Sequence, residues 1–126
     1  MPILSSKKRK SLRHVSTLAR YCFFDNYSAA EKLLMEVSNE INVDGDWGRG
    51  VMLAVKGMIS VGREGDPASF YLRCKGSSGE DLKILREGVL RDLSRDNITI
   101  FESGFLNAWL KIIDTFIEIF RERNKK

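Results

Sequence analysis

The sequence ESGFLNAWLKIIDTFIEIFRER, residues 102–123, decides the fold class of this chain. Its large apolar side chains recur at spacings of three and four residues, which places them on one wide face of an α-helix. These side chains are Phe105, Leu106, Trp109, Ile112, Ile113, Phe116, Ile117 and Phe120. A helix of roughly 20 residues spans about 30 Å, the diameter of a small domain. We therefore expect this helix to anchor the core, with each buried aromatic ring contributing about 1.5–3 kcal/mol.

Shorter segments with helical periodicity precede it. We expect helices over about 11–24, 28–42, 47–62, 67–75 and 78–94. The capping signals that place the later starts are Ser28 with Glu31, Asp46, Asp66 before Pro67, and Ser78 with Asp81. Residues 98–101 are mostly β-branched, but no second segment is available to pair with them. We expect an extended connection there, because an isolated strand is not stable.

Helices of this number, joined by short loops, predict an all-α fold. We expect a single domain of about five to six helices, arranged as an antiparallel bundle or as stacked helical hairpins. The length of 126 residues fits one domain, and a chain of this size buries enough apolar surface without disulfides or metal. Residues 1–10 are expected to form a flexible basic arm, residues 11–123 the helical domain, and residues 124–126 a basic tail.

The formal net charge of +4 conceals an uneven distribution. Of the 21 Lys and Arg residues, eight fall in residues 1–10 and 121–126, where Glu122 is the only acid. Residues 11–120 therefore carry 13 basic and 16 acidic side chains, a net charge of −3. A mildly acidic body with basic ends is the main electrostatic feature of the sequence.

Residues with catalytic or metal-binding chemistry do not form a recognisable pattern. His14 is the only histidine, and the sequence contains neither a nucleophile elbow nor a phosphate-binding loop. Asp44 and Asp46 flank Gly45, but Val55 stands where a calcium loop requires glutamate. We expect no enzyme activity, no catalytic residue, no metal site, no cofactor and no small-molecule substrate.

Membrane and secretion signals are also not found. Charged residues interrupt the apolar stretch 98–120, and a basic run follows Leu4 too closely for a signal peptide. Cys22 and Cys74 stand far apart in the sequence and predict reduced thiols. A bridge between them stays open, because it depends on a Cα separation below about 7 Å. We expect a cytoplasmic protein.

The N-terminal basic run suggests contact with nucleic acid. The residues that would bind phosphates are Lys7, Lys8, Arg9, Lys10 and Arg13. Each neutralised phosphate adds affinity that weakens as salt rises, because condensed counterions are released. The C-terminal cations extend this patch only if both ends lie on the same side of the fold. The alternative interpretation of the run is a solubilising tail.

A second hypothesis concerns apolar surface. Trp47 begins a glycine-rich helix. In the helix over residues 102–123, Ile119 lies off the main apolar stripe, and Phe120 is the last residue of that stripe. An exposed patch of large apolar side chains is typical of a protein interface, although all three can equally belong to an ordinary core. We expect a non-enzymatic helical interaction or adaptor module that binds a protein partner or a second copy of itself. The alternative is an RNA- or DNA-associated accessory subunit that uses the basic arm.

Overall fold

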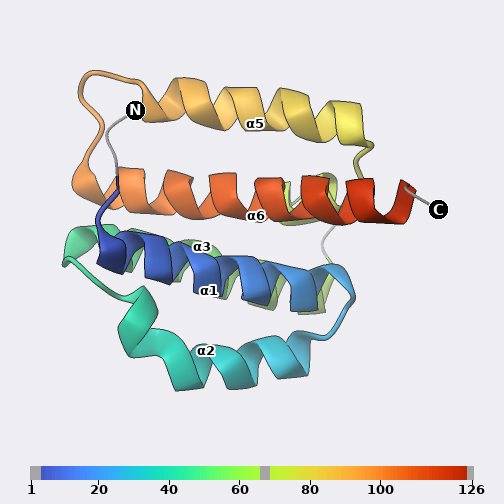
Figure 1. Ribbon diagram of the computed structural model, residues 1–126, viewed down its shortest axis with the longest axis horizontal. Coiled ribbons are helices and arrows are strands. Elements are labelled where there is room, and N and C mark those ends of the chain that lie inside the picture. The colour runs from blue at the N-terminus through green and yellow to red at the C-terminus, as the bar shows by residue number, and fades with distance from the viewer. Residues whose placement is uncertain (1–3, 66–68, 125–126) are drawn as a thin grey trace.

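The computed structural model describes residues 4–65 and 69–124 (Figure 1). Within these ranges the chain forms the helices α1 (Ser6–Phe23), α2 (Tyr27–Ile41), α3 (Asp46–Glu64), α4 (Phe70–Lys75), α5 (Gly79–Leu93) and α6 (Ile100–Asn124). No strand occurs in the described part of the chain. The expected all-α fold is therefore confirmed. None of the helices described combines the length and the hydropathy that crossing a bilayer requires.

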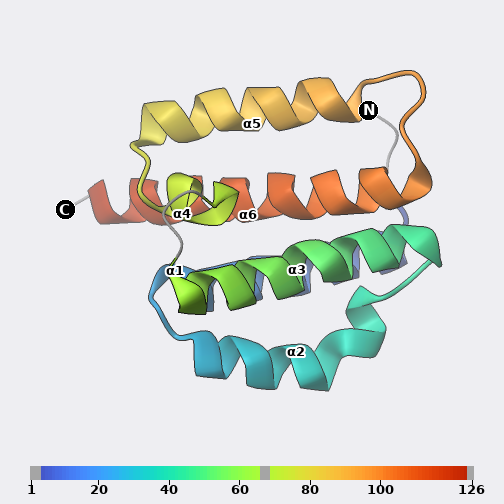
Figure 2. The same cartoon turned by 180° about the vertical axis from the view of Figure 1, so that it is seen from behind.

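Helix α6 lies in the middle of the molecule. It packs on α1 and α3 on one side and on α5 on the other, while α2 covers the far side of α1 and α3 (Figure 1). Consecutive helices run antiparallel in the pairs α1/α2, α2/α3 and α5/α6. The three central helices α1, α3 and α6 instead run in the same direction (Figure 2). The predicted antiparallel arrangement thus holds for these three pairs of consecutive helices.

The core is one cluster to which all six helices contribute. Its largest fully buried side chains include Trp47, Tyr71 and Phe116. Most of the predicted α6 stripe is buried, from Trp109 to Ile117, whereas Phe105, Leu106 and Phe120 remain half-buried. The helix that the sequence analysis expected to anchor the core therefore does so.

Close packing of α3 on α6 depends on two glycines. A Cβ placed on Gly50 would collide with the backbone of Phe101 and Phe105, and one placed on Gly104 would collide with the backbone of Trp47. The missing side chains let two helix backbones approach each other directly.

The first helix begins earlier than expected. Ser5 caps α1 by accepting a hydrogen bond from the Lys8 amide at 3.2 Å, and the helix starts at Ser6 rather than near residue 11. The prediction of a flexible arm is therefore wrong for residues 6–10, and residues 1–3 of that arm lie outside the described residues. At the other end α6 reaches Asn124, so only 125–126 of the predicted tail lie beyond the described chain.

The caps predicted at Ser28 and Asp46 are wrong. Asn26, not Ser28, caps α2 by accepting from the Ala29 amide at 3.4 Å. The residue before α3 is Gly45, whose positive φ of 63° lets the chain turn sharply, and Asp46 lies in the first helical turn. The predicted cap at Ser78 is confirmed, because its hydroxyl accepts from the Asp81 amide at 3.2 Å. The predicted cap at Asp66 lies outside the described residues.

The expected extended connection over residues 98–101 is replaced by a helix start. Thr99 Oγ1 accepts from the Glu102 amide at 3.0 Å, and Glu102 Oε1 accepts from the Thr99 amide at 3.4 Å. This reciprocal pair is a capping box, which satisfies two amides at the end of α6. Helix α6 therefore begins at Ile100, and the β-branched residues did not prevent it.

Candidate interaction surfaces

The five basic residues predicted to bind phosphates are distributed around the first turns of α1. Successive residues of a helix point about 100° apart, so a run of cations does not form one patch. Lys8 lies over the Trp47 ring, 5.2 Å from its centroid. Lys10 bonds to Glu40 at 2.6 Å, and this hydrogen bond lowers the pKa of that carboxyl. Two of the five cations are thus engaged within the fold.

Lys10 stays exposed in its pair with Glu40, and Lys7, Arg9 and Arg13 are exposed as well. Arg9 donates to the Leu4 carbonyl at 2.7 Å, and no carboxylate pairs with any of the latter three among the described residues. They extend from the first turns of a helix, where the backbone dipole is also positive. The pocket beside Lys7 and Lys10 is partly lined by Glu40 and Asp44, whose negative charges oppose an anion there.

The two basic ends of the chain lie apart. Helices α1 and α6 run in the same direction, so the start of α1 and the end of α6 are at opposite ends of the molecule (Figure 1). Arg123 accordingly lies 5.9 Å from the ring of Phe23, the last residue of α1. Arg121 and Arg123 therefore do not extend the basic patch, and Lys125 and Lys126 lie outside the described residues.

Two of the three residues predicted to form an apolar interface are part of the core. Trp47 and Ile119 are each 1% exposed, so neither reaches a partner on the surface. Gly50 of α3 and Gly104 of α6 let the two helices approach each other closely, and the indole is buried in their packing. Its Nε1 has no hydrogen-bond partner among the described residues, so packing and the Lys8 ammonium hold the ring. The prediction of an exposed patch at these two residues is wrong.

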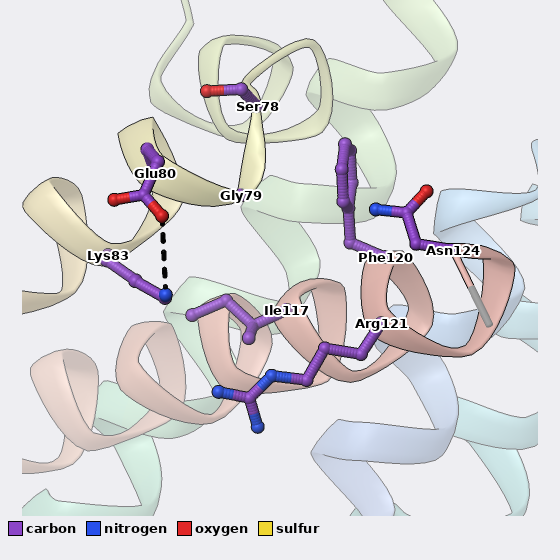
Figure 3. Close-up of a pocket in the computed structure, with 8 residues that line it drawn as sticks. All are labelled: Ser78, Gly79, Glu80, Lys83, Ile117, Phe120, Arg121 and Asn124. Atoms are coloured by element: carbon purple, nitrogen blue, oxygen red, sulfur yellow. Dashed lines mark hydrogen bonds and ion pairs between the residues drawn. The ribbon is translucent and has the colours of Figure 1, made fainter.

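Phe120, the third predicted interface residue, is half-buried beside a pocket of about 490 Å³ between the start of α5 and the end of α6. In Figure 3 its ring stands beside Ser78 and Gly79, to their right, while Arg121 points away from it along α6. Lys83 pairs with Glu80 at 3.4 Å, so these opposite charges offset each other at the rim. The pocket holds neither a buried charged group nor an unpaired buried polar one.

A second pocket, of about 320 Å³, is almost wholly apolar and lies between α3 and α6, with α4 at one end. We call it the α3–α6 groove. Its lining residues are Leu53, Ala54, Gly57, Val61, Ser69, Phe70, Tyr71, Phe105 and Trp109. At the α4 end, the ring of Phe70 packs edge-on against Trp109 with centroids 4.9 Å apart. The sequence analysis did not identify this groove.

Exposed apolar side chains lie along the groove. Leu53 is 53% exposed on α3, and Phe101, one turn before the groove residue Phe105, is 37% exposed on α6. No atom of the described residues lies within 4 Å of a Cβ built on Gly57, so this glycine leaves part of the groove open instead of serving a helix contact. Leu53 and Gly57 are not among the buried residues of α3, which include Val51, Ala54, Val55, Met58 and Ile59.

Charges near the groove on α3 are basic. On a helical surface the neighbours of Leu53 at spacings of four and three residues are Arg49 and Lys56. Arg49 forms an exposed pair with Asp46 at 3.1 Å within its own helix. Lys56 is exposed and has no ion pair among the described residues. This side of the groove therefore presents an unpaired cation next to an exposed leucine.

Titratable side chains offer no second kind of site. Across residues 4–65 and 69–124, no group of three or more His, Cys, Asp or Glu side chains comes together as a metal ion would require. His14 lies near Glu40, with Nε2 3.5 Å from Oε2. Comparison with known proteins gives no match to a protein family, a curated protein or a solved structure.

Proposed function

We propose that this chain is a non-enzymatic helical interaction module, and that it binds a protein partner through the α3–α6 groove. The observation that carries the proposal is an apolar groove beside which Leu53 is more than half exposed. Covering a large apolar side chain contributes about 1.5–3 kcal/mol. Leu53, Phe101 and Phe105 would form the apolar centre of such a contact. A cytoplasmic location belongs to the same proposal and is supported by the two unpaired cysteines.

Site-specific photo-crosslinking tests the proposal. A photoreactive phenylalanine analogue replaces Leu53, and the same analogue replaces Met35 as a matched control, because Met35 is 82% exposed on α2, away from the groove. We expect a discrete protein adduct from position 53 that position 35 does not give. The same variant carrying Gly57→Lys, which places a charge in the groove, should lose the adduct. Identical adduct patterns from both positions would contradict the proposal.

A nucleic-acid function is the second candidate, and the exposure of Lys7, Arg9 and Arg13 at the start of α1 favours it. Three phosphate contacts predict a slope of about −3 in a plot of log affinity against log salt. The first measurement is size-exclusion chromatography with light scattering on protein purified without nuclease. A complex that absorbs strongly at 260 nm, dissociates in salt and is lost when the three residues become alanine would establish this candidate. Protein that elutes free of nucleic acid would exclude it.

A further inference from the structure

The structure allows a more specific statement about the partner, which rests on the proposed function of the groove. We infer that the groove receives an amphipathic helix of another protein, and that acidic residues of this helix face α3. Three observations carry the inference: the place of α4 in the fold, the helical walls that α3 and α6 give the groove, and the basic charge of α3 beside it.

Helix α4 shows how the face of α6 is covered. It has only six residues, and its Phe70 seats an aromatic ring against Trp109. In Figure 2, α4 lies in front of the half of α6 nearer its C-terminus, and no described helix lies in front of the other half. Phe101 and Phe105 belong to that other half. A partner helix placed in line with α4 would cover both, because a helix about 10–12 Å wide suits a trough between two helices.

The backbone around the groove favours a helical partner over an extended one. Extended peptides bind mainly by adding a strand to a sheet edge, which provides free amides and carbonyls. The groove is formed by α3, α4 and α6, whose interior backbone groups bond within their own helices. A strand-like segment would therefore bury its own polar backbone without partners along α3 and α6. A helix satisfies these groups internally and presents apolar side chains at spacings of three and four residues.

The basic side chains of α3 indicate that the acidic side of the partner helix faces α3. Lys56 lies one turn from Leu53 and has no ion pair among the described residues, and Arg49 shares only an exposed pair with Asp46. Glutamate or aspartate beside the apolar stripe of the partner would complement both cations. A second copy of this chain is a poorer occupant. Packing α3 against α3 about a two-fold axis near Leu53 and Gly57 would bring the two Lys56 side chains close together.

Two designed peptides test the inference. Both are amphipathic 18-residue helices with the same leucine and phenylalanine stripe, and they differ only in carrying glutamate or lysine on the flank of the stripe. Binding is measured by isothermal titration calorimetry at about 50 and 300 mM salt and mapped by NMR chemical shifts. We expect the glutamate peptide to bind at least about tenfold more tightly at low salt, with a smaller ratio at high salt because exposed charges are screened.

Two variants connect this preference to the groove. Lys56→Glu should reverse the order of the two peptides, whereas Lys32→Glu, an equally exposed lysine on α2, should leave it unchanged. Gly57→Leu should weaken the glutamate peptide at least about tenfold, because the new side chain fills the groove. This variant is expected to fold, since a Cβ at position 57 meets no atom of the described residues within 4 Å.

The outcomes separate the inference from the proposed function. Equal binding of the two peptides would overturn the inference that the partner is acidic. A preference for the glutamate peptide that Lys56→Glu leaves unchanged would overturn it as well. A homodimer detected by light scattering and dissociated by Gly57→Leu would show that a second copy occupies the groove, and would also overturn it. A protein adduct from position 53, together with no binding of either peptide, would overturn the helical partner and leave the proposed function standing. Failure of both experiments would overturn both statements.

Discussion

Gly104 of α6 lies directly against the backbone carbonyl of Trp47 in α3, and no side chain fits between them. This contact holds the two helices close and buries the Trp47 indole. Gly57 lies ten residues after Trp47 in α3. A side chain at this position would face open space among the described residues instead of another helix. Two helical glycines of one interface therefore serve different purposes: Gly104 permits contact within the fold, and Gly57 leaves room beside the groove.

Alanine substitutions should separate the two roles. Gly104→Ala forces α3 and α6 apart, so we expect the free energy of unfolding to fall by about 1–3 kcal/mol. Gly57→Ala removes a flexible residue from a helix interior, and we expect a gain of up to about 1 kcal/mol. Urea denaturation of both variants measures these changes. Effects of the same sign would show that the two glycines do not differ in this way.

A chain of hydroxyl groups joins α4 to the turn between α1 and α2. The Tyr71 hydroxyl donates to the Cys22 carbonyl at 2.9 Å, which uses its only proton. The Tyr27 hydroxyl, 2.9 Å from that of Tyr71, must then be the donor between the two rings. Tyr27 itself fits against α3 because Gly62 has no side chain. This network ties the shortest helix to the rest of the fold.

Removing either hydroxyl should lower stability. Tyr71→Phe deletes the hydrogen bonds to Tyr27 and to the Cys22 carbonyl, so we expect a loss of about 1–2 kcal/mol. Tyr27→Phe deletes the bond to Tyr71 together with longer contacts to Asp25 and Lys75, both at 3.4 Å, and should cost about 1–2 kcal/mol as well. The double variant should cost less than the sum of the two, because both substitutions remove the same bond. Thermal and urea unfolding of the three variants measure the coupling. Additive losses would indicate that the two hydroxyls act independently.

The helices could be predicted from the sequence because their apolar periodicity reflects burial on one side. The starts of α1 and α6 could not be placed by the same reasoning. Four cations in the first turn oppose the helix dipole, yet α1 begins there because Ser5 caps it and Lys8 and Lys10 find partners on α2 and α3. The start of α6 was encoded in the spacing of Thr99 and Glu102, a capping box that the β-branched residues obscured.

The candidate groove was harder to predict, because it depends on how helices distant in sequence pack. Burial of Trp47 follows from the approach of α3 to α6, which no local pattern specifies. Ile119 is off the main α6 stripe, but α6 packs against helices on both sides and buries more than one face. Leu53 carried a usable signal, since a leucine outside the buried stripe of an amphipathic helix is left exposed.

Trp109 is the aromatic residue that links the core to the groove. Its ring is 8% exposed and packs against Phe70. We expect Trp109→Ala to lower the free energy of unfolding by about 3–5 kcal/mol, because it leaves a large cavity under α4. Met35→Ala on the exposed side of α2 provides the control and should change stability by less than about 0.5 kcal/mol. A loss below about 1 kcal/mol for Trp109→Ala would mean that the ring is not part of the core.

Both cysteines should resist thiol reagents in the folded protein. Burial raises the pKa of the Cys22 and Cys74 thiols from 9.0 to about 12 each, so almost no thiolate forms near pH 8. We expect a disulfide reagent such as Ellman's to label neither thiol in native protein and both in urea. Rapid labelling of native protein would show that at least one thiol is accessible.

The same pKa shift predicts how stability changes at alkaline pH. Below pH 9 both thiols are protonated in the folded and unfolded chain, so they contribute no pH dependence. Between pH 9 and 12 the unfolded chain releases these protons and the folded chain retains them, so the free energy of unfolding decreases as pH rises. A variant with alanine at both positions lacks this contribution, and its stability should fall less steeply over that range. Parallel curves for the variant and the natural chain would contradict the shift, because the other alkaline groups, Tyr71 among them, are the same in both.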